Sequence, residues 1–253
     1  MTDFRISFQL YSARKFPPLE AQIDTLAAIG YDAVEAYGDV YQSDPAAFRA
    51  LLDRAGLSCP SVHVSLAALD ADHARCVDGA RTLGVEIVVV PYLQPQERPA
   101  DAAGWKAVGL RLASHARALA ESGFQLAWHN HDFEFAPLPD GSRPIDHLLA
   151  PSGVMWEADV GWICRAGQEP AGALAAFAGR LAAFHIKDLA PAGVTEEDGW
   201  TDVGAGSVDW PALWPTIAGS AAQLLICEHD NPADWQRFAR RSHDYLSRLA
   251  GAR

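Results

Sequence analysis

Short apolar runs rich in β-forming residues alternate eight times with longer Ala- and Leu-rich stretches of helical period along the 253 residues. Strands are expected at 5–10, 32–36, 58–64, 86–92, 124–130, 154–159, 182–188 and 223–229. Helices are expected near 18–29, 45–55, 71–83, 102–122, 144–150, 169–179, 209–218 and 232–250. Parallel strands joined by helical crossovers produce this alternation. Eight such units in a chain of this length predict a (β/α)8 TIM barrel, one domain over residues 1–253.

Helix start and stop signals support the same division of the chain. Capping residues with a proline one or two positions later precede three of the expected helices, at Asp44, Asp209 and Asn231. Glycines follow four of them, at Gly30, Gly56, Gly84 and Gly123. An open doubly wound sheet is the alternative fold, but neither a G-x-G-x-x-G nor a G-x-x-x-x-G-K-[ST] loop occurs in the sequence. The long irregular segment 190–207, between the last two strands, is predicted to be an active-site loop.

Charge and cysteine content narrow the classes of function. Twenty Lys and Arg against 32 Asp and Glu give a net charge of −12, which disfavours binding to nucleic acid and suits a small polar substrate. Four scattered cysteines suggest neither a disulfide framework nor a zinc knuckle. Neither a signal peptide nor an apolar stretch long enough to cross a membrane is evident, so we expect a cytoplasmic protein. The sequence leaves open whether the protein forms a homo-oligomer.

Metal-binding and proton-transferring side chains gather where the expected strands end. In a TIM barrel the carboxyl ends of the strands form the active-site face. Alternation along each strand predicts that Asp159, His185 and Glu228 point into the barrel, while Cys227 points toward the helices. The other candidates near strand ends are His63, His129, His131, Glu134, Glu157 and Lys187. So many acids in one place would resist ionising together unless a cation joined them.

We predict that Glu134, Asp159, His185 and Glu228 bind one divalent metal ion. Three carboxylates and one imidazole make a mostly hard site, for which Mn²⁺ is the preferred ion and Mg²⁺, Co²⁺ or Zn²⁺ are alternatives. Around this set, His63, His131 and Lys187 are expected to bind substrate hydroxyls or carry charge, although a purely structural role for His63 is weighed equally. His129 and Glu157 are expected to orient the ligands, and Trp162 to form a wall of the substrate pocket.

Several segments resemble the xylose isomerase-like TIM barrels, also described as sugar phosphate isomerases/epimerases, a superfamily that includes endonuclease IV. The segments are FQLYSAR, IGYDAVEAYG, WHNHDFEF, WEADVGWICRAGQEP, FHIKDL, VGAGSVDW and ICEHDNP. The resemblance implies one divalent metal held by a Glu, Asp, His, Glu set, which falls here on Glu134, Asp159, His185 and Glu228. His129 stands where many relatives have the first glutamate, so His131 is the substitute for Glu134. Trp162 replaces a histidine of some sugar epimerases.

The expected activity is that of a metal-dependent sugar isomerase or epimerase. It would act on a ketose or keto-sugar by proton transfer through a metal-stabilised enediolate, with Glu134 and Glu228 moving the proton. The first alternative is a metal-dependent dehydratase (lyase) of a keto-inositol or keto-glycoside. The alternative outside enzymology is a sugar- or metal-binding barrel without turnover. Endonuclease activity is disfavoured because a three-metal site needs more ligands and the net charge opposes DNA.

Overall fold

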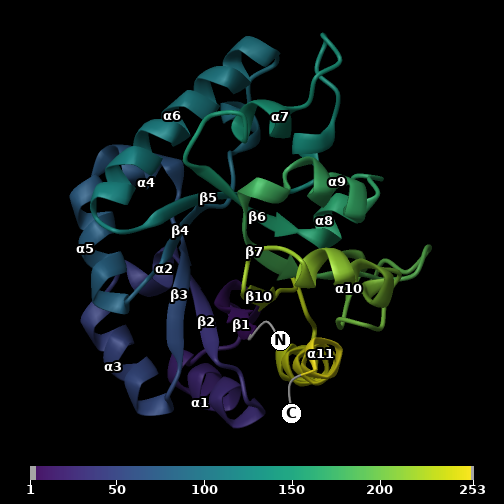
Figure 1. The fold of residues 1–253 in the computed structure, drawn as a ribbon. Coiled ribbons are helices and arrows are strands. Elements are labelled where there is room, and N and C mark those ends of the chain that lie inside the picture. Colours follow the sequence, from purple (N-terminus) through teal and green to yellow (C-terminus); the bar gives the residue numbers. More distant parts are fainter. Residues whose placement is uncertain (1–3, 252–253) are drawn as a thin grey trace.

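The computed structural model describes residues 4–251 and contains a closed barrel of parallel strands in the order β1-β10-β7-β6-β5-β4-β3-β2 (Figure 1). The strands are β1 Arg5–Gln9, β2 Ala33–Tyr37, β3 Ser58–His63, β4 Ile87–Val90, β5 Gln125–His129, β6 Val154–Asp159, β7 Leu181–Ile186 and β10 Leu224–Cys227. Each boundary of the barrel strands falls within two residues of the expected one, which confirms the predicted (β/α)8 fold. Residues 1–3 and 252–253 of the expected domain lie outside the described part.

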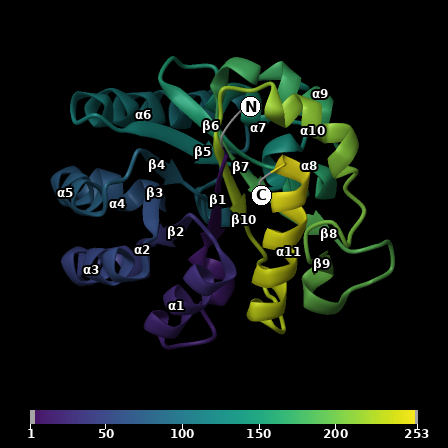
Figure 2. The ribbon, with the colours of Figure 1, turned by 60° about the horizontal axis from the view of Figure 1, so that its bottom comes forward.

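Helices surround the barrel on the outside (Figures 1 and 2). They are α1 Leu19–Ile29, α2 Gly38–Tyr41, α3 Pro45–Ala55, α4 Leu66–Ala71, α5 His73–Leu83, α6 Ala102–Glu121, α7 Pro144–Leu148, α8 Val160–Arg165, α9 Pro170–Ala176, α10 Trp210–Ala218 and α11 Trp235–Ala250. Short 3₁₀ turns lie at Leu10–Ala13, Pro95–Glu97, Phe133–Phe135, Ala178–Arg180 and Glu196–Gly199. No described helix is long and apolar enough to cross a membrane.

Most of the helix boundaries follow the expected capping signals. The side chains of Asp44 and Asp209 accept hydrogen bonds from the amides of Ala47 and Ala212, as predicted. Gly30, Gly56, Gly84 and Gly123 all have positive φ. The expected start of the last helix at Asn231 is wrong, because Asp234 caps α11 through the amides of Gln236 and Arg237. The short helices α2, α4 and α8 were not predicted.

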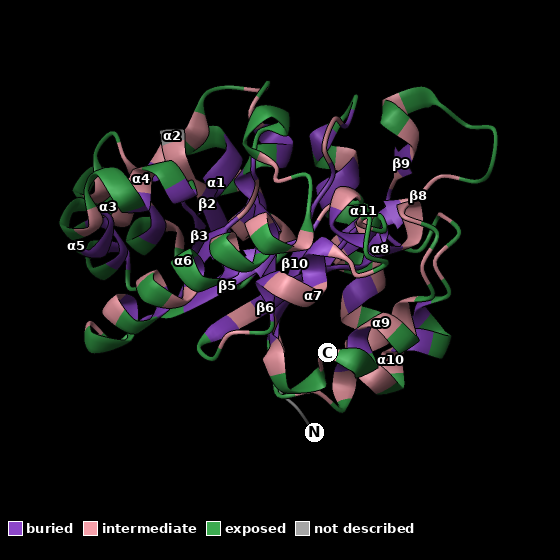
Figure 3. Ribbon diagram, turned by 90° about the horizontal axis from the view of Figure 1, so that it is seen from above, coloured by how far each residue is buried: buried purple, intermediate pink, exposed green. Residues whose placement is uncertain are grey.

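Two apolar regions stabilise the barrel. The larger one lies between strands and helices and receives every second strand residue, among them Trp128, Phe184 and Cys227. Figure 3 shows the strands buried and the outer faces of the helices exposed. The smaller region fills the barrel interior near the amino ends of the strands, with Ile87, Val89, Ala127, Ala183, Leu224 and Ile226. We call this second cluster the apolar floor.

The segment between β7 and α10 contains a small antiparallel sheet of β8 Asp188–Leu189 and β9 Trp200–Thr201. Figure 2 shows this hairpin beside α11. The Asp188 carboxylate accepts hydrogen bonds from the amides of Gly204, Gly206 and Val208 and from the indole of Trp210. A Cβ atom on Gly206 would lie 2.1 Å from the carbonyl oxygen of Leu189, so only glycine fits there. These hydrogen bonds fix the segment 190–207, predicted to be an active-site loop, to Asp188 just after β7.

Candidate metal and active site

Four neighbouring strands bring donor atoms to one point inside the barrel. His129 ends β5, Asp159 ends β6, His185 lies near the end of β7, and Glu228 follows β10. All four side chains are buried. One ligand atom from each lies within 4.8 Å of the other three. We call these residues the mouth group.

The contacts around Asp159 fit a common cation. Asp159 Oδ1 caps α8 by accepting a hydrogen bond from the Trp162 amide, at 2.9 Å. Asp159 Oδ2 has no hydrogen-bond partner among the described residues. It lies 3.7 Å from Nε2 of His129 and 3.9 Å from Nδ1 of His185. Ligand atoms about 2.0–2.1 Å from a tetrahedral cation lie roughly 3.3 Å apart, so a modest adjustment would let these atoms bind one divalent ion.

The structure does not bring Glu134 together with the other predicted ligands. Glu134 lies in a 3₁₀ turn after β5, where Oε1 accepts from the Trp128 indole at 3.0 Å and Oε2 from the His131 amide at 2.8 Å. Trp128 packs among the helix-facing residues, so the Glu134 carboxylate is held behind the strand. Burial raises the pKa of Glu134 to about 8. In the mouth group, His129 occupies the ligand position that the sequence analysis assigns to Glu134.

A second set of titratable residues lies directly beneath the mouth group. Oε2 of Glu157 lies 2.8 Å from Nε2 of His63, 3.1 Å from Nδ1 of His129 and 3.1 Å from Nε2 of His185. Oε2 of Glu35 lies 2.9 Å from Nε2 of His63 and 2.8 Å from Nε2 of His185. We call Glu35, His63 and Glu157 the inner group. The expected placement of Glu157 one layer below Asp159 agrees with these contacts.

Glu35 was missed in the sequence analysis. It lies in the middle of β2, fully buried, and its neighbours Val34 and Ala36 pack toward the helices. The available signal was a single acid on the inner face of an otherwise apolar strand. Its contact with His185 depends on how the closed barrel brings β2 opposite β7, which no local pattern reveals.

Lys187 links the mouth group to the rim. Its Nζ atom lies 2.9 Å from Glu228 Oε2, 3.3 Å from Asp159 Oδ2 and 2.9 Å from Asp230 Oδ1. The rings of Trp162 and Trp200 enclose it, at 5.3 and 4.9 Å from Nζ. The structure thus places the predicted residues Lys187 and Trp162 beside the site and adds Trp200, which the sequence analysis did not select.

The charges at the site change the ionisation of its members. Burial disfavours the imidazolium form of His185, but Glu157, Glu228 and Glu35 outweigh it and raise its pKa well above the usual value. Burial also opposes ionisation of Glu228, yet Lys187 and His185 hold the pKa of that carboxyl well below its usual range. Burial raises the pKa of Asp159 to about 6. Without a bound metal, protons on the site residues balance the negative charge of the acids. A bound cation would supply this positive charge instead.

His131 and Asn130 have different roles at the end of β5. Oδ1 of Asn130 accepts from the Trp156 indole at 2.8 Å and from the Asp159 amide at 2.9 Å, which ties the ends of β5 and β6 together. The ring of His131 lies 5.0 Å from that of Trp162, and its Nδ1 atom is buried without a hydrogen-bond partner in the described part of the chain. Burial lowers the pKa of His131 to about 3, so its imidazole is neutral.

Gly161 leaves room for Lys187. A Cβ atom on Gly161 would lie 2.8 Å from both Cγ and the carbonyl oxygen of Lys187. We expect Gly161→Ala to lower the free energy of unfolding by about 1–3 kcal/mol, the usual cost of overpacking. Gly179→Ala is the control, because a Cβ atom there meets nothing within 4 Å among residues 4–251. Equal denaturant midpoints for the two variants would contradict this packing argument.

The comparison with known families agrees with the geometry. Residues 23–249 match the sequence profile of the xylose isomerase-like TIM barrels. The chain belongs to this family. The resemblance noted from the sequence segments is thereby confirmed. The rhizopine catabolism protein MocC of Rhizobium meliloti is 26% identical over 279 residues, an alignment that covers 93% of this chain and 82% of that protein.

Several solved structures match nearly the whole chain. A sugar phosphate isomerase/epimerase from Parabacteroides distasonis has a TM-score of 0.80 at 20% identity, covering 97% of this chain and 94% of that one. The IOLI protein with a bound zinc atom has a TM-score of 0.78 at 12% identity, covering 98% of each. A barrel protein from Mycobacterium smegmatis in complex with magnesium has a TM-score of 0.74 at 17% identity, covering 98% and 97%. These likenesses establish the fold.

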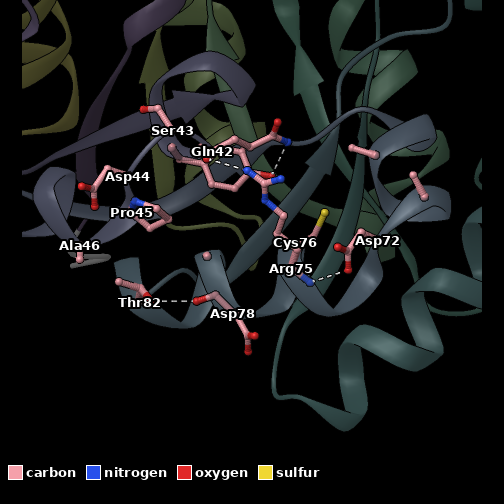
Figure 4. Close-up of a pocket in the computed structure, with 14 residues that line it drawn as sticks. Gln42, Ser43, Asp44, Pro45, Ala46, Asp72, Arg75, Cys76, Asp78 and Thr82 are labelled. Carbon is pink, nitrogen blue, oxygen red and sulfur yellow. Dashed lines mark hydrogen bonds between the residues drawn. The ribbon is translucent and has the colours of Figure 1, made fainter.

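A cavity of about 480 Å³ lies outside the barrel, between α3 and α5 (Figure 4). Two acids on its border, Asp44 and Asp72, cap helices, and Arg75 donates a hydrogen bond to the carbonyl oxygen of Gln42. Burial raises the pKa of the Cys76 thiol, which disfavours the reactive thiolate. In this family's fold, chemistry belongs to the carboxyl ends of the strands, so the mouth group is the better candidate site.

Proposed function

We propose that this chain is a divalent-metal-dependent isomerase or epimerase that moves a proton beside the carbonyl of a ketose or keto-sugar. The observation that carries the proposal is the meeting of His129, Asp159, His185 and Glu228 at one point, where Asp159 Oδ2 has the Lys187 ammonium group 3.3 Å away but no hydrogen-bond partner among the described residues. These four residues would hold the ion. When bound, a divalent cation polarises a substrate carbonyl and favours negative charge on its oxygen.

We propose a transition metal for this position. Two imidazoles and two carboxylates make a softer donor set than the three carboxylates expected from the sequence. Such a set favours Zn²⁺, Co²⁺ or Mn²⁺ over Mg²⁺, which prefers oxygen ligands and retained waters. Mn²⁺ remains within the proposal as one of these ions.

Two side chains are suited to proton transfer. Glu228 is ionised, because Lys187 and His185 depress its pKa, so it can accept a proton from carbon. His131 is neutral and has a buried, unpartnered Nδ1 atom within the described residues, so it can take up a proton once negative charge on the substrate offsets the burial that lowers its pKa. We propose that His131 takes the second proton-transfer role, which the sequence analysis assigns to Glu134. A pair of such groups serves epimerisation if they address opposite faces of the carbon.

Lys187 and the two tryptophans are proposed to bind the substrate. The Lys187 ammonium group is present at neutral pH, because the charges of Asp159, Asp230 and Glu228 overcome the effect of burial and raise its pKa. It can donate a hydrogen bond to a substrate oxygen. The rings of Trp162 and Trp200, 4.8 Å apart and nearly perpendicular at 71°, offer an apolar surface for one face of a sugar.

Solvent deuterium incorporation tests the proposal. The purified protein, stripped with a chelator and reloaded with Zn²⁺, Co²⁺, Mn²⁺ or Mg²⁺, is incubated in D₂O with a panel of ketoses, keto-glycosides and keto-inositols. We expect deuterium at one carbon beside the carbonyl, detected by NMR, and its loss after chelation. A new ultraviolet absorbance from an enone would identify dehydration instead. Incorporation that survives complete chelation, or none with any ion and substrate, would contradict the proposed function.

A further inference from the structure

The two histidines of the mouth group each lie between two layers of carboxylates. Nδ1 of His129 lies 3.1 Å from Glu157 Oε2, while its Nε2 lies 3.7 Å from Asp159 Oδ2. Nε2 of His185 lies 2.8 Å from Glu35 Oε2, while its Nδ1 lies 2.7 Å from Glu228 Oε2 and 3.9 Å from Asp159 Oδ2. Each ring therefore turns one nitrogen toward the inner group and the other toward the mouth group.

This placement indicates the tautomer that each ring would have with a metal ion bound. An ionised carboxylate only accepts hydrogen bonds, so the ring nitrogen that faces an inner acid carries the hydrogen. In a neutral imidazole the opposite nitrogen then has a free lone pair. For His129 this is Nε2, which faces Asp159 Oδ2, and for His185 it is Nδ1, which faces both Asp159 Oδ2 and Glu228 Oε2. In the metal-free site the 2.7 Å hydrogen bond to Glu228 keeps a hydrogen on His185 Nδ1, and a bound ion would take the place of that hydrogen.

We propose that Glu35 and Glu157 are positioning residues that fix the ring orientation and tautomer of His129 and His185 for metal binding. This inference rests on the proposed function and deepens it. Metal-binding histidines commonly donate their second ring N–H to a carboxylate, which orients the ring and makes the ligand nitrogen more basic. Here the two acids would do this from β2 and β6, beneath the mouth group.

One ligand atom from each of His63, His129, Glu157 and His185 also lies within 4.8 Å of the other three, and hydrogen bonds close this set. The nitrogen–oxygen separations between these histidines and the two inner acids are 2.8–3.1 Å, the length of charge-assisted hydrogen bonds. Nε2 of His63 lies within 2.9 Å of both Glu35 and Glu157, so it bridges the two acids.

Glu35 is itself held in place from β1. Gln9 Nε2 donates to Glu35 Oε2 at 2.6 Å, and Gln9 Oε1 accepts from the Tyr11 amide at 3.0 Å, which fixes the direction of the amide. Both inner acids are fully buried, and in each the Oε1 atom has no hydrogen-bond partner in the described part of the chain. Apolar side chains would fill this space at less cost in desolvation. The acids are therefore better explained by the histidines they orient.

Histidine NMR on the unmodified protein tests the tautomers directly. With ¹⁵N-labelled histidine and added Zn²⁺, we expect His129 to keep hydrogen on Nδ1 and His185 on Nε2, with zinc on the opposite nitrogens. Zinc bound through His129 Nδ1 or His185 Nε2 would overturn this inference and leave the proposed function standing. If Zn²⁺ changes no histidine signal, both fail.

Substitution of the acids tests their effect on metal binding. Glu35→Gln and Glu157→Gln are each expected to weaken Zn²⁺ binding by about 10–100-fold in chelator competition. They should also change the visible spectrum of the Co²⁺-loaded protein, which reports ligand geometry. Ser7→Ala is the control, because Ser7 is buried in β1 and its hydroxyl has no hydrogen-bond partner within residues 4–251.

A merely structural role predicts a different result for the same variants. It would lower the melting temperature of the metal-free protein while leaving Zn²⁺ affinity and the Co²⁺ spectrum as in the Ser7→Ala control. That outcome overturns the inference even if the enzyme proves metal-dependent. If the glutamine variants fail to fold, the tautomers measured by NMR in the unmodified protein decide whether Glu35 and Glu157 position the two histidines.

Discussion

Glu228→Gln is expected to lower kcat by about 10³-fold, within the usual range for loss of a general acid or base. The amide cannot accept the proton, and it is a weaker ligand than the carboxylate that lies 2.7 Å from His185. The fold should survive, because glutamine has nearly the same shape. The measurement is steady-state turnover of the ketose that incorporates deuterium, together with circular dichroism of the variant.

Glu196→Gln provides the matched control for Glu228→Gln. Glu196 is an exposed acid on the rim segment, so its substitution removes the same charge without touching the mouth group. We expect its kcat to stay within about twofold of the unmodified protein, since exposed charges contribute little. Full turnover by Glu228→Gln would refute the assignment of Glu228 to proton transfer.

His129→Ala and Glu134→Ala should have opposite effects on metal binding and stability. Loss of His129 removes one of the four donors of the mouth group, and we expect Zn²⁺ affinity to fall by about 10²–10³-fold. Loss of Glu134 leaves the Trp128 indole and the His131 amide unpaired, at a cost of about 1–3 kcal/mol each in unfolding free energy. Its effect on Zn²⁺ affinity should be small.

The pair of variants decides between two readings of the WHNHDFEF segment. Zn²⁺ titrations give the affinities, and denaturant unfolding of the metal-free proteins gives the stabilities. If Glu134→Ala abolishes Zn²⁺ binding while His129→Ala does not, then Glu134 reaches the ion as the sequence analysis expects. The arrangement of the mouth group described above would then be wrong.

The barrel could be predicted because its signals are local. Alternation placed Asp159, His185 and Glu228 inside the barrel, and helix-facing partners such as Cys227 outside, which the structure confirms. Capping aspartates and positive-φ glycines marked most helix ends. The helices α4 and α8 span only Leu66–Ala71 and Val160–Arg165, too short for a helical period to stand out.

The parts of the site that were mispredicted depend on geometry between segments. Glu134 lies five residues after His129, and the 3₁₀ turn at Phe133–Phe135 directs its carboxylate back behind β5. No residue spacing shows which way such a turn leads. Glu35 contacts His185 only because the sheet closes into a barrel, and Trp200 reaches Lys187 only because β9 pairs with β8.

The two ends of the barrel strands differ in what their inward-facing side chains do. Ile87, Leu224 and their neighbours pack at one end of the barrel, while every donor atom discussed above lies toward the other. Thermal stability could therefore be raised by repacking the apolar floor or strengthening the Arg5–Glu86 pair, without changing any residue of the mouth group. For the same reason, changes in substrate preference would be sought in the loops at the carboxyl ends of the strands, while the apolar floor at the amino ends stays unchanged.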